Sequence, residues 1–156
     1  MILFLLNISD YSCFPNLQEL DLSFNALQKV EKLEKLHFLQ KLDLTKNSLT
    51  HLPSLPRSIR WLGLGYNQLS SLTSFPPLTQ LHTLELQHNI LVDVRQLRQI
   101  PQLQILKLEY NKIQEIEDDF FDKFPQLQHL SLAENPLPQK TLDKWNSWIL
   151  QKNSKS

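Results

Sequence analysis

One pattern, LxxLxLxxNxL, recurs six times in this chain of 156 residues and constrains its fold more than any other feature. The copies begin at Leu17, Leu39, Ile59, Leu81, Leu103 and Leu127, and their asparagines are spaced by 22, 20, 22, 22 and 24 residues. Self-similarity at such a period is typical of a solenoid, in which each repeat forms one coil and buries its apolar side chains against the next coil.

Two leucines separated by one residue stand at the centre of each copy and predict a short strand with one buried face. The pairs are Leu20 and Leu22, Leu42 and Leu44, Leu62 and Leu64, Leu84 and Leu86, Leu106 and Leu108, and Leu130 and Leu132. We expect the coils to stack through parallel strands, with these leucines inside and the residues between them displayed on one concave sheet. After each asparagine the apolar period changes to three, which favours 3₁₀ turns on the return side of the coil.

The asparagine of each copy is expected to satisfy backbone groups at the turn that leaves the strand. A side-chain amide both donates and accepts hydrogen bonds, so it can serve its own coil and the next one. The predicted structural ladder consists of Asn25, Asn47, Asn67, Asn89, Asn111 and Asn135. Replacing a central member, as in Asn89→Leu, should cost ~1–3 kcal/mol for the groups left unsatisfied.

The pattern predicts a single domain over residues 1–156, with six repeats in 17–138 and a cap at each end, because an outermost coil would otherwise expose its leucines. Residues 139–152 predict a capping helix with Thr141 as its N-cap, although a partner-binding amphipathic helix is an alternative. Its apolar side chains are Leu142, Trp145, Trp148 and Ile149.

Residues 1–16 are expected to form the N-terminal flank or cap. Their apolar start, residues 1–6, lacks the basic residues and the length of a signal peptide. We therefore interpret it as a terminal strand or cap that packs on the first repeat.

These motifs resemble the leucine-rich-repeat superfamily over about residues 17–138. The repeats that begin at Leu17, Leu81 and Leu103 are similar to the 22-residue type of protein phosphatase regulators and bacterial internalins. The Leu-Pro pairs at 52–53 and 55–56 resemble the 20-residue repeat of secreted bacterial effectors, whereas residues 113–124 look like a 24-residue type common in animals and plants, so the origin stays open. The resemblance implies an α/β fold, a right-handed β-α superhelix with about six parallel concave strands and a C-terminal capping helix.

The outward strand residues and the residue before each asparagine form the predicted binding surface. Apolar side chains such as Trp61 and Ile105 add nothing to the interior from such positions, whereas aromatic anchors dominate binding energies at interfaces. The candidate protein-binding residues are Trp61, Tyr66, His88, Ile105, Tyr110, Gly63, Gly65, Glu85, Lys107 and Asp43.

Two structural alternatives stay open for this surface. The loop aromatics Phe24, Tyr66 and Tyr110 could stack on one another and stiffen the edge of the coils instead of binding a partner. Gly63 and Gly65 could leave a bare notch beside Trp61, or they could make room for neighbouring side chains.

Composition excludes several other functions. Sixteen Lys and Arg balance sixteen Asp and Glu, so no net charge favours nucleic acid or an anionic membrane, and no apolar run is long enough to span a bilayer. Cys13 is the single cysteine, which favours a reducing, cytoplasmic location. The five histidines are scattered and an open surface desolvates no carboxylate, so we expect no catalytic residue, metal or other cofactor.

The sequence therefore predicts a non-catalytic, monomeric protein–protein interaction module that binds a protein partner on its concave face. A secreted bacterial effector acting in the host cytoplasm is one form that such a module takes. The alternative is an intracellular regulatory or targeting subunit of an enzyme such as a phosphatase or a ubiquitin ligase. A third hypothesis is self-association through the edge of the N-terminal strand.

Overall fold

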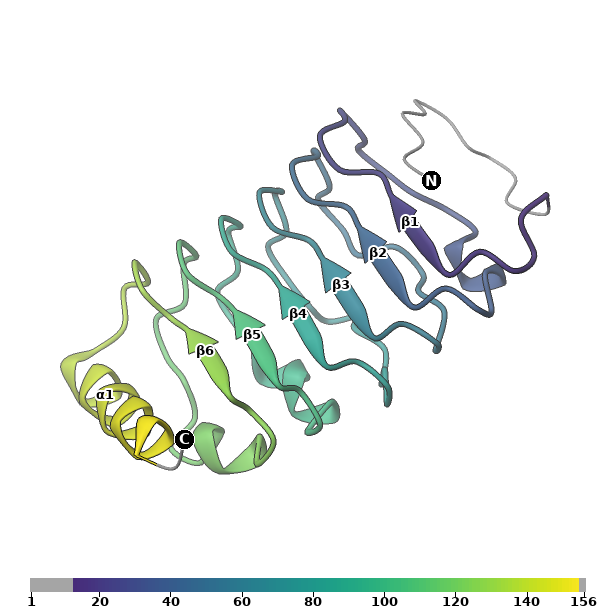
Figure 1. The fold of residues 1–156 in the computed structure, drawn as a ribbon. Coiled ribbons are helices and arrows are strands. Elements are labelled where there is room, and N and C mark those ends of the chain that lie inside the picture. The colour runs from purple at the N-terminus through teal and green to yellow at the C-terminus, as the bar shows by residue number, and fades with distance from the viewer. Residues whose placement is uncertain (1–12, 155–156) are drawn as a thin grey trace.

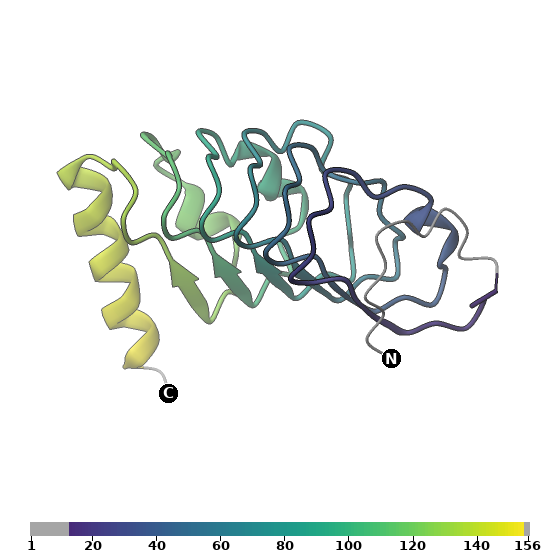
Figure 2. The same cartoon turned by 90° about the horizontal axis from the view of Figure 1, so that it is seen from above.

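The computed structural model describes residues 13–154, which form a single stack of coils (Figures 1 and 2). Six strands pair in parallel in chain order, and the register aligns the first leucine of every pair. The strands are β1 (Glu19–Asp21), β2 (Lys41–Asp43), β3 (Trp61–Gly63), β4 (Thr83–Glu85), β5 (Ile105–Lys107) and β6 (His129–Ser131). This confirms the expected α/β solenoid with six parallel strands.

The paired leucines fill the interior, as the alternation of apolar residues predicts. All twelve are at most 4% exposed, and they belong to one continuous core that runs the length of the stack. Figure 2 shows the strands along one side of the stack and the return arcs along the opposite side. The residues between the leucines therefore lie on the strand side of the coils.

The return arcs are thin, in agreement with an apolar period of three. Three of them contain short 3₁₀ helices, η1 (Leu33–Lys35), η2 (Arg95–Gln99) and η3 (Phe120–Lys123). The proline-rich arc is different: residues 44–60, all of them described, form no helix and instead bury Pro53, Leu55 and Pro56. Proline fixes φ near the value of an extended chain, so this arc closes its coil without a helix.

The turn that leaves each strand has a left-handed residue although the chain contains only two glycines. The residue before each asparagine has φ between 53° and 57°. These residues are Phe24, Lys46, Tyr66, His88, Tyr110 and Glu134. Non-glycine side chains rarely adopt this conformation, so the turns are held by their surroundings, which include the asparagine amides and backbone hydrogen bonds to the next coil.

Each asparagine from the second repeat onward joins its own coil to the preceding one. Asn67 Nδ2 donates to Leu64 O (3.0 Å) in its own coil and to Leu44 O (2.9 Å) in the preceding coil, while its Oδ1 accepts from Leu49 N (2.9 Å). The same three bonds recur at Asn47, Asn89, Asn111 and Asn135. Within the described residues, the amide of Asn25 donates to its own coil.

Helix α1 (Gln139–Asn153) closes the stack beside β6 (Figure 1). Leu142, Trp145 and Trp148 pack against the core. The indole of Trp145 also donates from Nε1 to Leu130 O (3.2 Å), a backbone carbonyl of the outermost strand. This helix is the expected C-terminal cap.

The predicted N-cap of this helix is wrong. The helix begins at Gln139, and its N-cap is Pro138 in an extended conformation (φ −68°, ψ 152°). Thr141 instead lies within the first turn, where it is 8% exposed and its N–H donates to Pro138 O. Proline readily takes the extended angles of a cap position, which allows the helix to start two residues before Thr141. The apolar start at 1–6 and most of the expected cap at 1–16 lie outside the described residues.

Candidate binding surface

The strand face is defined here as the outward strand residues, arranged in three columns, together with the loop row before the asparagines. Parallel register places equivalent residues side by side from coil to coil. The three columns are Glu19, Lys41, Trp61, Thr83, Ile105 and His129; Asp21, Asp43, Gly63, Glu85, Lys107 and Ser131; and Ser23, Thr45, Gly65, Gln87, Glu109 and Ala133. The loop row is Phe24, Lys46, Tyr66, His88, Tyr110 and Glu134.

The Trp61 indole lies over Gly63, which is two residues further along the same strand. A Cβ at Gly63 would stand 2.6 Å from the outer edge of the Trp61 indole, and 2.8 Å and 2.9 Å from oxygens of Asp43 and Thr45. The Nζ of Lys41 lies 5.4 Å from the centre of the same indole. Trp61 is therefore half-buried against its own strand, with part of its surface still exposed.

The expectation of a bare notch at the two glycines is wrong. Gly63 accommodates Trp61, and Gly65 accommodates Gln87, whose amide atoms would lie 2.8–3.0 Å from an added Cβ. Both glycines are buried and neither has a positive φ. Their role in the structure is to provide room for two larger side chains on the strand face, which is the structural alternative left open by the sequence.

The loop row forms a continuous stack of rings and cations. The His88 ring stacks between Tyr66 (4.1 Å between centroids, 15° between planes) and Tyr110 (4.3 Å, 11°). The Nζ of Lys46 extends the series, at 4.4 Å from the Phe24 ring and 5.3 Å from the Tyr66 ring. Ring faces are thus covered by neighbours, while Tyr66 and Tyr110 remain 42% and 49% exposed. The stacking that the sequence left as an alternative is present in the structure.

The charged candidates are engaged with neighbours on the strand face. Lys107 Nζ and Glu85 Oε1 form an ion pair of 2.7 Å across β4 and β5. Asp43 accepts a hydrogen bond from the backbone N–H of Thr45 (2.9 Å). Ile105 is half-buried at the start of β5, two strands from Trp61, or roughly 10 Å at the usual strand spacing. The structure therefore brings the candidate residues together on one surface over β2–β5.

Within residues 13–154, no three His, Cys, Asp or Glu side chains are placed to hold a metal ion. His88 is stacked between two tyrosines and His129 is exposed at the last strand. None of the described helices has the length and apolar character needed to cross a membrane.

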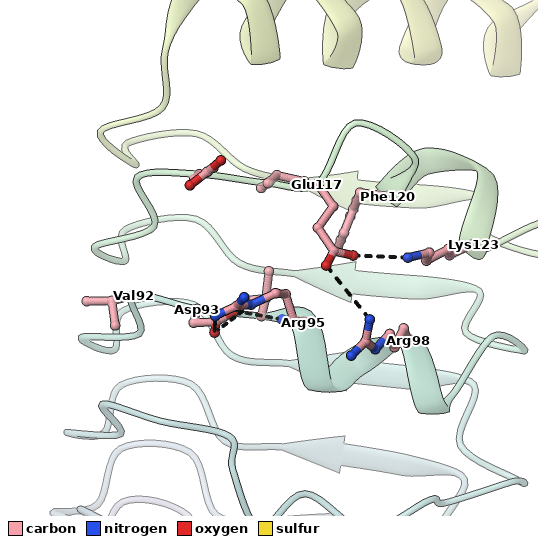
Figure 3. Close-up of a pocket in the computed structure, with 10 residues that line it drawn as sticks. Val92, Asp93, Arg95, Arg98, Glu117, Phe120 and Lys123 are labelled. Atoms are coloured by element: carbon pink, nitrogen blue, oxygen red, sulfur yellow. Dashed lines mark hydrogen bonds and ion pairs between the residues drawn. The ribbon is translucent and has the colours of Figure 1, made fainter.

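The structure contains a cavity on the return side that the sequence did not predict. It has a volume of about 220 Å³ and lies between the arcs that follow β4 and β5 (Figure 3). Val92, Ile116 and Phe120 supply apolar lining, and charged residues surround them. Two arcs of different length and helix position form this cavity, so the repeat pattern alone contains no signal for it.

Most of the charges around this cavity are paired with one another, and Glu115 is the exception among the lining residues. Arg95 binds Asp93 (2.7 Å), while Lys123 (3.0 Å) and Arg98 (3.8 Å) approach Glu117. The hydrogen bond from Arg95 lowers the pKa of Asp93. Because five of the six charged lining residues already have partners, the cavity offers fewer unsatisfied polar groups to a ligand than its composition suggests.

Comparison with known proteins places the chain in a family. The model described as "Leucine rich repeat" matches residues 79–137, and the model described as "Leucine Rich repeats (2 copies)" matches residues 15–54. The chain belongs to the leucine-rich-repeat superfamily.

Among its relatives, human mimecan is 34% identical over 124 residues, which is 76% of this chain and 41% of mimecan. Rat lumican is 33% identical over 160 residues, covering 82% of this chain and 47% of lumican. An internalin from Listeria monocytogenes shares the fold, with a TM-score of 0.75 at 22% identity over 86% of this chain and 39% of the internalin. The chain thus spans less than half the length of these curated relatives.

The expectation of a cytoplasmic protein is wrong. Mimecan and lumican are secreted proteins of the extracellular matrix. The expectation depended on a single cysteine, which says little about location when a chain spans less than half of its relatives' length.

Proposed function

We propose that this chain is a non-catalytic recognition module that binds a protein partner on the strand face around Trp61 and Ile105. The observation that carries the proposal is their position: both side chains point away from the leucine core, at equivalent places two strands apart, and both keep part of their surface exposed. Partly exposed aromatic and aliphatic side chains that a partner can desolvate supply most of the energy at protein interfaces. Membership of the leucine-rich-repeat superfamily supports the same function.

Recognition suits this surface better than catalysis does. The strand face is one side of an open sheet, and its ion pair and ring stack hold the side chains in fixed positions before a partner arrives. Rigid side chains lose little entropy on binding, which favours affinity. Catalytic acids and bases need desolvation to shift their pKa values, and an open sheet provides little of it.

The test is partner binding by the Trp61→Ala variant. The wild-type chain serves as the bait that captures partner proteins from extracellular fluid. The affinity of each identified partner for the wild type and for the variant is then measured by calorimetry. We expect Trp61→Ala to weaken binding by ~1–4 kcal/mol while the thermal unfolding midpoint changes little. Val92→Ala, at an exposed position on the return side, is the matched control and should bind like the wild type. Weaker binding of Val92→Ala, with Trp61→Ala unaffected, would place the interface on the return side.

Two finer hypotheses from the sequence stay predictions. One is a bacterial effector, and the other is a targeting subunit that directs a phosphatase or a ubiquitin ligase. An enzymatic activity that copurifies with the chain and is absent from the pure chain would support the second hypothesis.

A further inference from the structure

The strand face and the rest of the chain carry opposite charge. The strand face contains six carboxylates (Glu19, Asp21, Asp43, Glu85, Glu109 and Glu134) and three lysines (Lys41, Lys46 and Lys107), so its formal net charge is −3. Because the whole chain has a formal net charge of +0, the remaining residues carry +3. A partner that approaches the strand face therefore meets a local negative potential that the overall composition conceals.

The three lysines of the strand face are already engaged inside the molecule. Lys107 is paired with Glu85 at 2.7 Å. Lys41 lies over the Trp61 indole and Lys46 lies over the rings of Phe24 and Tyr66. The positive charge on this surface is therefore already directed at its own carboxylate and aromatic groups.

Two acceptor atoms at the centre of the strand face lack a donor from the described chain. Glu109 Oε2 and Gln87 Oε1 are both buried, and neither has a hydrogen-bond partner among the described residues. The two residues lie on adjacent coils, since His88 N donates to Glu109 O (3.0 Å). The chain itself covers both atoms, so a bound group meets the part of the Glu109 side chain that stays exposed. A carboxylate favours a cationic N–H donor, and Glu109 forms none of the ion pairs found among the described residues.

We propose that the strand face binds a basic, extended segment of a partner protein. This inference rests on the proposed function and names the chemistry of the partner. Ile105 and Glu109 lie on the same coil, four residues apart, which is roughly 13 Å in an extended chain. An apolar side chain of the segment contacts Trp61 and Ile105, and a Lys or Arg about four residues away pairs with the partly exposed carboxylate side chain of Glu109. A second copy of this chain is the wrong partner, because two strand faces of charge −3 repel each other.

The test uses a phage-displayed library of random twelve-residue peptides, selected on the wild-type chain. We expect enrichment of peptides with Lys or Arg within about four residues of an aromatic or aliphatic residue. The enriched peptides should bind Glu109→Gln about tenfold more weakly, because this near-isosteric change removes the charge of the acceptor. Glu34→Gln, which removes an exposed carboxylate on η1, is the matched control and should bind like the wild type. Unfolding curves of the variants verify that each one is folded.

Three outcomes overturn the inference: enrichment of acidic or neutral peptides, basic peptides that bind Glu109→Gln as well as the wild type, and a selection that enriches nothing. The Trp61→Ala variant separates these outcomes from failure of the proposed function. If the enriched acidic or neutral peptides still lose affinity with Trp61→Ala, the strand face is a binding surface and only its preference for basic segments is wrong. If peptide binding is unaffected by both substitutions, the proposed function fails as well.

Discussion

The Asn89→Leu variant tests how strongly the asparagine ladder holds the coils together. Asn89 is 5% exposed in the centre of the stack. Its Nδ2 donates to Leu64 O (3.0 Å) and Leu86 O (3.1 Å), and its Oδ1 accepts from Leu69 N (2.9 Å). Leucine has a similar volume and can make none of these bonds. The substitution leaves Leu69 N without its acceptor, while Leu64 O and Leu86 O each lose one of two donors and keep the bond from Asn67 Nδ2 or Asn111 Nδ2.

The expected cost follows from those three bonds. A typical intramolecular hydrogen bond contributes about 1 kcal/mol net, and a buried group left unsatisfied costs about 1–3 kcal/mol. We therefore expect the free energy of unfolding to fall by about 3 kcal/mol. Urea unfolding followed by far-ultraviolet circular dichroism measures this change.

The matched control is Asn146→Leu, because Asn146 is an exposed asparagine on α1. This change should alter the free energy of unfolding by less than about 0.5 kcal/mol. Equal effects of the two substitutions, or an Asn89→Leu cost below about 1 kcal/mol, would refute the role of the ladder in holding neighbouring coils together.

Three further predictions concern glycine, the C-terminal cap and pH. Gly63→Ala should displace the Trp61 indole and lower the free energy of unfolding by about 1 kcal/mol, with a shift in tryptophan emission as the readout; unchanged emission would contradict the observed close contact. Trp145→Phe keeps most of the ring packing but removes the donor to Leu130 O, so unfolding should be easier by about 1 kcal/mol in urea, whereas Trp148→Phe removes no such bond to β6. Asp118 binds Lys144 (2.6 Å) and Lys140 (3.4 Å), which lower the pKa of its carboxyl below 3.8. The Asp118 carboxylate therefore contributes fully to the docking of α1 above about pH 4, and this contribution is lost as the pH falls through the lowered pKa. We expect tryptophan emission to report this loss as an acid transition, and Asp118→Asn should reduce the transition.

The interior of this fold was predictable because the repeat itself encodes it. Leucine alternation fixes which side of each strand is buried, and the asparagine at a constant offset supplies one amide for every turn. The volume of neighbouring side chains on the strand face explains the glycines, which have no pattern in the repeat. Gly63 makes room for Trp61 of the same strand, and Gly65 makes room for Gln87 of the next coil. The sequence could assign a residue to the strand face. It could not predict the conformation of that residue's side chain, because the conformation depends on neighbouring side chains.

The start of α1 and the cavity on the return side were harder to predict, because neither depends on the residues that the repeats share. The start of α1 depends on whether Pro138 or Thr141 occupies the cap, and a preference for threonine at caps did not outweigh the local backbone. The cavity near Phe120 forms only where the arcs of two unlike repeats meet. Such features arise from contacts between repeats that differ, and a pattern built on what the repeats share does not describe them.

Hydroxyl-radical footprinting of the chain, alone and with a captured partner, tests directly whether the strand face is the binding surface. We expect the partner to protect Trp61, Ile105 and Tyr110 on the strand face from oxidation. Phe38, Val92 and Leu150, which are 57%, 57% and 70% exposed, should react equally with and without it. Protection of these three residues, with Trp61 and Ile105 still fully reactive, would contradict the proposal that this protein binds its partner through the strand face.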